Sequence, residues 1–294
     1  MKRNKKQQIA VKIIKKQEVI ARSQVDHINT ERRIFAQLDH PFIVKFKGSD
    51  KDEQSLYLFM EAIAGGELFT LLRSWHRVDL AHARFYCAQV VTAFEYLHSR
   101  NLIYRDLKPE NLLVDSEGYL KLTDFGLVKL CLYKTYTVCG TPEYMAPEVL
   151  LNKGHGSGVD WWTLGVFLYE LLVGLPPFYD HDPIKMYDKI INNKPRFLKG
   201  FDPGAKDLVR RLLHKDVTKR IGNLRNQAQD IRRHPFFFGF NWAKLLERKL
   251  DAPFVPPKLD FTAFKELRDD EKKEERVPKA YEYLCRDDDP FKNW

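Results

Sequence analysis

The sequence predicts an α+β fold with a small strand-containing front and a larger, mainly helical back. Short runs rich in β-branched or aromatic residues occur near the front, at residues 9–14 and 56–60. After Gly65-Gly66, apolar residues recur mostly at the spacing of helices. The 294 residues are enough for one large domain or two lobes, with a sizeable buried core.

The predicted elements follow in order along the chain. After the strand at residues 9–14, residues 22–38 are expected to form a surface helix, because apolar side chains recur there among charged ones. After the strand at 56–60, the clearest helix is predicted over residues 79–99, whose apolar side chains fall on one face. Further helices are expected over residues 160–172, 183–192, 203–214 and 226–233. Prolines from residue 253 onward then end the regular structure and open a tail.

The composition is that of a globular protein with a basic excess. Hydrophobic residues make up 44% and charged residues 30%, which excludes collagen-like, low-complexity and wholly disordered proteins. Lysine and arginine number 49, against 40 aspartates and glutamates. Much of this excess lies in the first sixteen residues, without a stripe of basic and aromatic residues, so we expect no nucleic-acid partner. The most apolar stretch, residues 164–172, is far shorter than the ~20 residues that span a bilayer, so we expect no membrane span.

Cysteine usage and the N-terminus favour an intracellular protein. Cys87, Cys131, Cys139 and Cys285 include no pair at the C-x-x-C spacing of metal knuckles and redox motifs, so reduced thiols are expected. Near the basic N-terminus, Lys12 interrupts the only apolar run before it reaches the length of a signal-peptide core. We therefore expect no secretion signal.

The segment with the most chemical information is Tyr104-Arg105-Asp106-Leu107-Lys108-Pro109-Glu110-Asn111. Asp124-Phe125-Gly126 follows thirteen residues after Asn111. An Arg-Asp pair alone is usually a surface ion pair, and an Asp-Phe-Gly triplet alone is often a turn, but the combination is highly specific. Phosphoryl transfer needs residues that hold metal ions, neutralise phosphate oxygens and orient a hydroxyl, and this combination offers all three.

This stretch resembles the catalytic loop and metal-binding turn of eukaryotic protein kinases, and the resemblance spans nearly the whole chain. It implies a bilobal protein-kinase-like fold, with a kinase domain at 1–236, composed of an N-lobe at about 1–62 and a C-lobe at about 67–236, and a C-terminal kinase tail at 237–294. It also implies ATP and Mg²⁺ as cofactors. By this resemblance Asp106 would accept the proton of the substrate hydroxyl and Lys108 would neutralise the transferred phosphoryl group. Asn111 and Asp124 would hold two magnesium ions.

The resemblance also assigns nucleotide contacts and two structural residues. Lys12, in Ala10-Val11-Lys12, would bind the α- and β-phosphates. Glu31, ahead of Glu18, would pair with it, because an unpaired ammonium buried in an apolar strand is costly. The further ATP-binding positions are Met60 and Glu67. Glu148 is expected to pair with Arg220, and Asp160 to anchor the backbone of the catalytic loop.

Two further motifs, Cys139-Gly140-Thr141-Pro142-Glu143-Tyr144 and the final Phe291-x-x-Trp294, resemble the cyclic-nucleotide-dependent kinases, the cAMP-dependent catalytic subunits in particular. This implies phosphorylation of protein serine and threonine, cyclic-nucleotide-linked signalling, a cyclic-nucleotide-binding regulatory subunit, and a cytoplasmic location with the nucleus as a second one. Three acids, Glu67, Glu110 and Asp188, would receive arginines before the acceptor, because carboxylates match the guanidinium fork. An apolar shelf for the residue after the acceptor would comprise Val138, Pro142 and Met145.

Thr137 occupies the position of an activating phosphate in these kinases. A phosphate adds about two negative charges and requires cations. The resemblance supplies His27, Arg105 and Lys129 for that role, with Thr135 and Thr141 as competing hydroxyls.

The main departure from the family pattern is the Gly-rich loop that covers the nucleotide phosphates. Only eleven residues precede Lys12, and none is glycine, so we expect a truncated sequence whose small lobe lacks two strands and has a bare sheet edge. The cluster Gly154-His155-Gly156-Ser157-Gly158 is expected to be a flexible surface turn.

Two alternatives stay open, a cGMP-dependent kinase fragment and a non-catalytic kinase-fold interaction protein. A smaller departure is Tyr136, which replaces a tryptophan that helps the family to dock its regulatory subunit.

Overall fold

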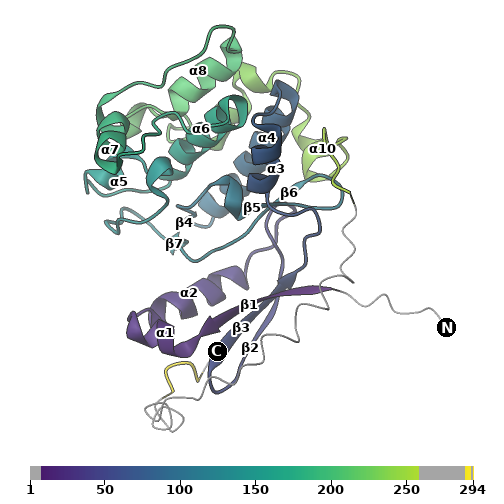
Figure 1. Ribbon diagram of the computed structural model, residues 1–294, viewed down its shortest axis with the longest axis vertical. Coiled ribbons are helices and arrows are strands. Elements are labelled where there is room, and N and C mark those ends of the chain that lie inside the picture. The colour runs from purple at the N-terminus through teal and green to yellow at the C-terminus, as the bar shows by residue number, and fades with distance from the viewer. Residues whose placement is uncertain (1–7, 258–288, 293) are drawn as a thin grey trace, which may run out of the picture. The chain divides into compact units, whose positions relative to one another are not determined.

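The computed structural model describes residues 8–257, 289–292 and 294. The chain divides into two compact units (Figure 1). Unit 1 comprises Met1–Leu38, Lys45–Ala64 and Pro257–Trp294, and unit 2 comprises Asp39–Val44 and Gly65–Pro256. Most of the predicted tail, residues 258–288 with Cys285, lies outside the described residues. The small strand-containing unit and the large helical unit confirm the predicted bilobal kinase-like fold.

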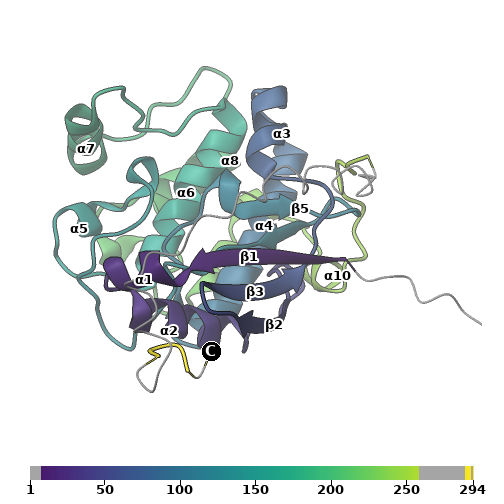
Figure 2. The same cartoon turned by 60° about the horizontal axis from the view of Figure 1, so that its bottom comes forward.

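Unit 1 is a three-stranded antiparallel sheet with two helices on one side (Figure 1). Its elements are β1 (Ile9–Lys15), α1 (Lys16–Ala21), α2 (Val25–Phe35), β2 (Phe46–Lys51) and β3 (Ser55–Glu61). The strand order is β1-β3-β2, so β1 is an edge strand within the described part of the sheet (Figure 2). The predicted strands and the longer helix are confirmed.

Two elements of unit 1 escaped prediction. The β2 segment, Phe-Lys-Gly-Ser-Asp-Lys, is largely polar and has a register shift between Phe46 and Gly48, so it shows no clear alternation. Its pairing with β3 makes it a strand. With six residues, α1 is too short to show a helical period.

The predicted Phe-x-x-Trp motif packs into unit 1. Phe291 is completely buried in a small core with Val19, Ile28 and Leu56, one residue each from α1, α2 and β3. Lys51 Nζ donates to the carbonyl oxygen of Phe291 at 2.6 Å. This C-terminal motif therefore ties both helices to the sheet.

Unit 2 contains most of the described helices and two small two-stranded sheets. In chain order its elements are α3 (Leu68–Trp75), α4 (Leu80–His98), β4 (Leu102–Ile103), η1 (Pro109–Asn111), β5 (Leu112–Val114), β6 (Leu120–Leu122), β7 (Lys129–Leu130), η2 (Pro142–Tyr144), α5 (Pro147–Leu150), α6 (Gly158–Val173), α7 (Pro183–Asn192), α8 (Pro203–Leu212), η3 (Val217–Lys219), α9 (Ala228–Arg232), η4 (Pro235–Phe237) and α10 (Trp242–Leu246).

The core of unit 2 is built around α6, which packs against both α4 and α8 (Figure 1). Almost every side chain of α6 from Gly158 to Leu171 is buried. The helix ends at Gly174, whose φ of 94° suits glycine and where a Cβ would meet the carbonyl oxygen of His76 at 2.3 Å. The helices predicted from residues 79, 160, 183, 203 and 226 are all confirmed as α4, α6, α7, α8 and α9.

Other features of unit 2 differ from expectation. The sheets β4–β7 and β5–β6 are antiparallel pairs of two or three residues, too short for an alternating pattern. The glycine cluster at 154–158 is not the flexible surface turn that we expected. Its His155 is buried and pairs with Thr135 through two backbone hydrogen bonds of 2.8 and 2.9 Å. A Cβ on Gly154 would lie 2.8 Å from the ring of Tyr136, so close packing explains this glycine.

None of the described helices is both long and apolar enough to cross a bilayer. Within the described part of the chain, Cys87, Cys131 and Cys139 are free thiols.

Candidate active site

The catalytic loop lies between β4 and η1, and its backbone is anchored by Asp160 of α6. The completely buried carboxylate of Asp160 accepts hydrogen bonds from the N–H groups of Tyr104 and Arg105, at 2.9 and 2.8 Å. Arg105 has a φ of 72°, a conformation that costs free energy for a residue with a side chain. The Asp160 bonds offset this strain, and the predicted anchoring is confirmed.

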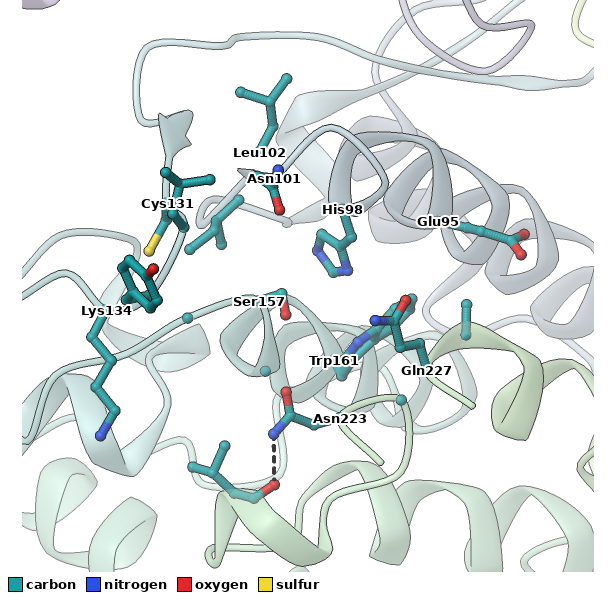
Figure 3. Close-up of a pocket in the computed structure, with 18 of the residues that line it drawn as sticks. Glu95, His98, Asn101, Leu102, Cys131, Lys134, Ser157, Trp161, Asn223 and Gln227 are labelled. Carbon is teal, nitrogen blue, oxygen red and sulfur yellow. Dashed lines mark hydrogen bonds between the residues drawn. The ribbon is translucent and has the colours of Figure 1, made fainter. Parts of the chain in front are cut away.

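A cavity of about 400 Å³ lies behind this anchor (Figure 3). His98, which contacts Asp160 Oδ2 through Nε2 at 2.7 Å, lines it together with Trp161. Figure 3 shows His98 and Asn101 extending into the cavity from the end of α4 and the following turn. None of the predicted catalytic residues lines it, so this space backs the catalytic loop rather than the reacting groups.

Asp106 is the centre of a hydrogen-bonded cluster. Its Oδ2 accepts from Asn111 Nδ2 at 2.8 Å, and its Oδ1 accepts from Thr141 Oγ1 at 2.9 Å. Lys108 Nζ lies 3.1 Å from Asp106 Oδ2 and also donates to Thr141 Oγ1 at 3.0 Å. The structure therefore brings three predicted site residues of the loop together.

Thr141 is a member of this cluster that we did not predict, because its hydroxyl was expected only to compete with Thr137 for phosphate. Its hydroxyl accepts from Lys108 and donates to Asp106, so one side chain holds both. The motif Cys-Gly-Thr-Pro-Glu was visible in the sequence, but nothing in it indicates a contact 35 residues away.

The predicted metal turn begins at Asp124, which has a φ of 56°, and Gly126 N–H donates to its Oδ1 at 3.2 Å. The preceding residue, Thr123, donates its N–H to the carbonyl oxygen of Asn111 at 3.0 Å. This bond links the backbones that carry the two predicted ligands. The buried side chain of Tyr104 also contacts this turn, because its hydroxyl donates to Thr123 O at 2.5 Å. Burial first, and then the charges of Asp106, Asp124 and Asp160, raise the pKa of Tyr104 well above its ordinary value.

Asn111 and Asp124 fit a hard cation such as Mg²⁺. Asn111 Nδ2 donates hydrogen bonds to both the backbone and the side chain of Asp106. The oxygen of the same amide, Oδ1, can therefore serve as a metal ligand. Asp124 supplies a carboxylate. Among the described residues, no group of three His, Cys, Asp or Glu side chains forms a competing metal site.

The segment from Asp124 to Glu148, here named the activation segment, carries Thr137 on an exposed stretch. Lys129 Nζ donates to Thr135 Oγ1 at 2.8 Å and to Thr137 Oγ1 at 3.4 Å. Arg105 Nε donates to Leu127 O at 2.7 Å, whereas its buried NH1 has no hydrogen-bond partner among the described residues. The structure thus places Lys129 at Thr137 and leaves one guanidinium nitrogen of Arg105 unsatisfied. His27 is an exposed residue of α2 in unit 1.

This geometry agrees with the comparisons with known proteins. Residues 1–237 match the family model of the protein kinase domain. The chain belongs to the protein kinase family. The curated relatives of this kinase domain include cAMP-dependent protein kinase catalytic subunit 3 of Drosophila melanogaster, 47% identical over 247 residues, which are 84% of this chain and 42% of the relative.

Two other relatives of the kinase domain have similar names. The cAMP-dependent protein kinase catalytic subunit of Dictyostelium discoideum is 44% identical over 286 residues, 95% of this chain and 44% of the relative. The cAMP-dependent protein kinase type 3 of Saccharomyces cerevisiae is 42% identical over 283 residues, 96% of this chain and 70% of the relative. The chain thus spans less than half of the length of the first two relatives.

The kinase domain contains a cluster of glutamates that includes one predicted residue and two missed ones. Tyr144 donates its hydroxyl hydrogen to Glu170 Oε2. Burial first, and then the charges of Glu110 and Glu143, raise the pKa of Glu170 to about 7, although the hydrogen bond from Tyr144 acts in the opposite direction. Glu110 was predicted to receive a substrate arginine. Glu143 and Glu170 were not predicted. Glu143 lies in a motif that served only for the resemblance to cyclic-nucleotide-dependent kinases, and Glu170 lies within an apolar helix.

The remaining substrate candidates lie apart in the chain. Glu67 is exposed immediately before α3. Asp188 is an exposed residue of α7 that accepts a hydrogen bond from Asn192 at 2.7 Å. Of the apolar shelf, Val138 and Pro142 are exposed and Met145 is half-buried.

In unit 1 of the kinase, Lys12 Nζ lies 2.9 Å from Glu31 Oε1, which confirms the predicted pairing. Their burial differs from expectation. The Lys12 side chain is 37% exposed, whereas Glu31 is only 4% exposed, so the carboxylate is the group that requires a partner. Met60 lies on β3 opposite Ala10.

The second predicted pair, Glu148 with Arg220, is also confirmed. Two parallel bonds join Arg220 NH1 to Glu148 Oε1 at 2.6 Å and NH2 to Oε2 at 2.9 Å. Arg220 is completely buried, and it also donates to the carbonyl oxygens of His214 and Gly158. The pair fixes the end of the activation segment to the helical core.

Proposed function

We propose that this chain is the catalytic part of an ATP-dependent kinase that phosphorylates protein serine and threonine hydroxyls preceded by arginine. The observation that carries the proposal is the setting of Asp106, whose carboxylate is held by Asn111 and Thr141 beside the ammonium of Lys108. A fixed arrangement of this kind suits phosphoryl transfer, because positioning and electrostatic stabilisation supply most of the rate.

Asp106 would act as the base toward the substrate hydroxyl. As the hydroxyl oxygen attacks the γ-phosphorus, its proton passes to the Asp106 carboxylate, and the bond from phosphorus to the β–γ bridging oxygen breaks. Lys108 would donate to the oxygens of the transferred group and offset their charge. Thr141 would keep both side chains in place through its single hydroxyl.

Asn111 and Asp124 would hold Mg²⁺ with the nucleotide. The metal, when bound, neutralises charge on the phosphate oxygens. Lys12 would bind the α- and β-phosphates, with its ammonium directed by Glu31. Met60 and Glu67 are the further proposed nucleotide contacts.

Substrate arginines would bind to carboxylates of the kinase. Glu110 and Glu170 form the best-supported pair, since their charges already interact without a cation between them. A guanidinium would relieve this repulsion and donate hydrogen bonds to both carboxylates at once. Glu67 and Asp188 are proposed as further acids of this kind, and Val138, Pro142 and Met145 as the apolar shelf.

Phosphorylation of Thr137 would complete the activation segment. The phosphate would accept from Lys129, which already reaches Thr137, and from the unsatisfied NH1 of Arg105. His27 is the third proposed cation. Because Arg105 adjoins Asp106, the phosphate would stabilise the catalytic loop directly.

Regulation by a cyclic-nucleotide-binding subunit is part of the proposal, since the named relatives are cAMP-dependent kinases. We place the protein in the cytoplasm, with the nucleus as a second location. Release of activity from a regulatory subunit by cAMP would support this, and selective release by cGMP would favour the cGMP-dependent alternative.

The test is transfer of label from γ-labelled ATP to matched peptides. Three peptides carry two arginines and differ only in a serine, threonine or tyrosine acceptor, and a fourth has serine with both arginines replaced by alanine. We expect label in the serine and threonine peptides alone, and kcat/KM lower by about 100-fold or more without the arginines. Label in the tyrosine peptide, or transfer independent of arginine, would contradict the specificity. A chain that binds MgATP in a thermal-shift assay but transfers nothing would favour the non-catalytic alternative.

A further inference from the structure

A second cavity of unit 2, of about 570 Å³, is lined largely by cationic side chains. Its lining residues come from the end of α7 and the segment after it, and from the end of α8 and the residues that follow. Figure 2 shows where these two helices lie. The lining residues are Asn192, Asn193, Lys194, Pro195, Arg210, Leu213, His214 and Lys215. Three of the eight are lysine or arginine and one is histidine, while none is acidic, so the cavity presents one sign of charge.

Two acids near this cavity pair with cations outside it. Asp207 pairs with Arg211 at 2.8 Å and Asp216 lies 3.7 Å from Lys219, and neither cation lines the cavity. Among the described residues, Lys194, Arg210 and Lys215 form no ion pair. The cations outside the cavity, Arg211 and Lys219, therefore have acidic partners. The lysines and the arginine that line the cavity have none among the described residues.

The uncompensated cations are held close together. Arg210 stacks over the ring of Phe197 at 5.3 Å, which fixes its stem. Burial and the charge of Lys194 lower the pKa of Lys215, and Asp188 is the one carboxylate that opposes this effect. Two neighbouring ammonium groups destabilise each other's charged form. An anion that binds between them offsets this repulsion, so that the pKa of each lysine rises toward its ordinary value.

We propose that this cavity binds a small ligand that carries clustered phosphates. Its volume lies in the range of ligand sites, and three cations on one lining match several phosphate oxygens rather than one. A polyphosphorylated polyol has this chemistry, either free in solution or as a lipid headgroup. The cavity behind the catalytic loop (Figure 3) serves as a contrast, because its lining is mostly neutral and lacks such a cluster. The proposal is independent of kinase activity, since no catalytic residue lines the basic cavity.

The test is calorimetric titration of the full chain with inositol hexakisphosphate at ~0.15 M salt, where nonspecific charge effects are screened. The cavity variant is Lys194→Ala with Lys215→Ala. Its matched control, Arg211→Ala with Lys219→Ala, removes the same charge from the compensated cations outside the cavity. We expect binding to weaken by about 100-fold in the cavity variant, from two charge-assisted contacts, and by less than about twofold in the control.

A second measurement follows the lysines by NMR of ¹³C-methylated protein. The pKa of Lys215 should rise when the ligand binds, whereas a fold defect would not produce this rise. A parallel arm uses vesicles with phosphatidylinositol 4,5-bisphosphate. If the chain binds these vesicles but not the free inositol phosphate, and the cavity variant does not bind them, the proposal holds with a lipid headgroup as the ligand. Equal weakening in both double variants, or no binding in either arm, would overturn it.

Discussion

Thr141 Oγ1 lies 2.9 Å from Asp106 Oδ1, although 35 residues separate them in the sequence. The same oxygen accepts a hydrogen bond from Lys108. The end of the activation segment is thereby joined to the centre of the catalytic loop. Any rearrangement of that segment must either carry Thr141 with it or release Asp106 and Lys108.

Replacement of Thr141 by alanine should lower kcat for peptide phosphorylation by about tenfold to 100-fold, because two charge-assisted hydrogen bonds are lost at once. Thr141→Ser keeps the hydroxyl and should restore most of the rate. The KM for ATP should change little in either variant. Steady-state kinetics measure both quantities, and a serine variant as slow as the alanine variant would show that the methyl group, not the hydroxyl, matters.

The pKa of about 7 at Glu170 predicts pH-dependent recognition of arginine. The carboxyl group is neutral below this pH and charged above it, so an arginine-containing peptide should bind better as the pH rises. Between pH 6 and pH 8 its KM should fall by up to about tenfold, which follows the ionised fraction of one such group. Glu170→Gln should flatten the profile. A profile that persists in the glutamine variant would assign the titration to another group.

The buried pair Glu148–Arg220 should dominate the stability of unit 2. Arg220→Ala leaves a buried carboxylate without its cation and should lower the free energy of unfolding by about 3–5 kcal/mol. Arg211→Ala, which removes an exposed partner of Asp207, should cost less than about 1 kcal/mol. Urea denaturation gives both values, and comparable costs would show that the Arg220 pair contributes no more than a surface pair.

Thr137→Ala should lower the kcat of protein that otherwise carries phosphate at this position, because Lys129 and Arg105 lose their anionic partner. The matched control is Thr70→Ala, at an exposed threonine of α3. Mass spectrometry identifies the phosphorylated protein, and peptide kinetics measure the effect. Unchanged turnover between protein with and without this phosphate would remove Thr137 from the account.

The long helices were predictable because their sequences carry both period and boundaries. The helix α7 begins at Pro183, after the capping residue Asp182, and ends at Asn192 as expected. Likewise Asp79 caps α4 through the N–H of His82. The short strands β4 to β7 escaped because two or three residues cannot show alternation, and tertiary contacts decide their state.

The site was predictable where neighbouring residues carry it. Asp106, Lys108 and Asn111 share one loop. The Lys12–Glu31 pair was predicted from the need of a buried lysine for a partner, although the buried group in the structure is the Glu31 carboxylate. Glu170 escaped because it reads as a single polar residue in an apolar helix, and its proximity to Glu110 exists only in the folded protein.

The central claim is that Asp106 takes the proton of the substrate hydroxyl. The most direct measurement is transfer of label from γ-labelled ATP, with magnesium, to the arginine-containing serine peptide by the wild-type chain, Asp106→Asn and Glu53→Gln, the last at an exposed carboxylate of unit 1. We expect kcat to fall by about 100-fold to 10,000-fold in the asparagine variant and to be unchanged in the control, with MgATP binding retained in both. Equal transfer by Asp106→Asn and the wild-type chain would contradict the claim.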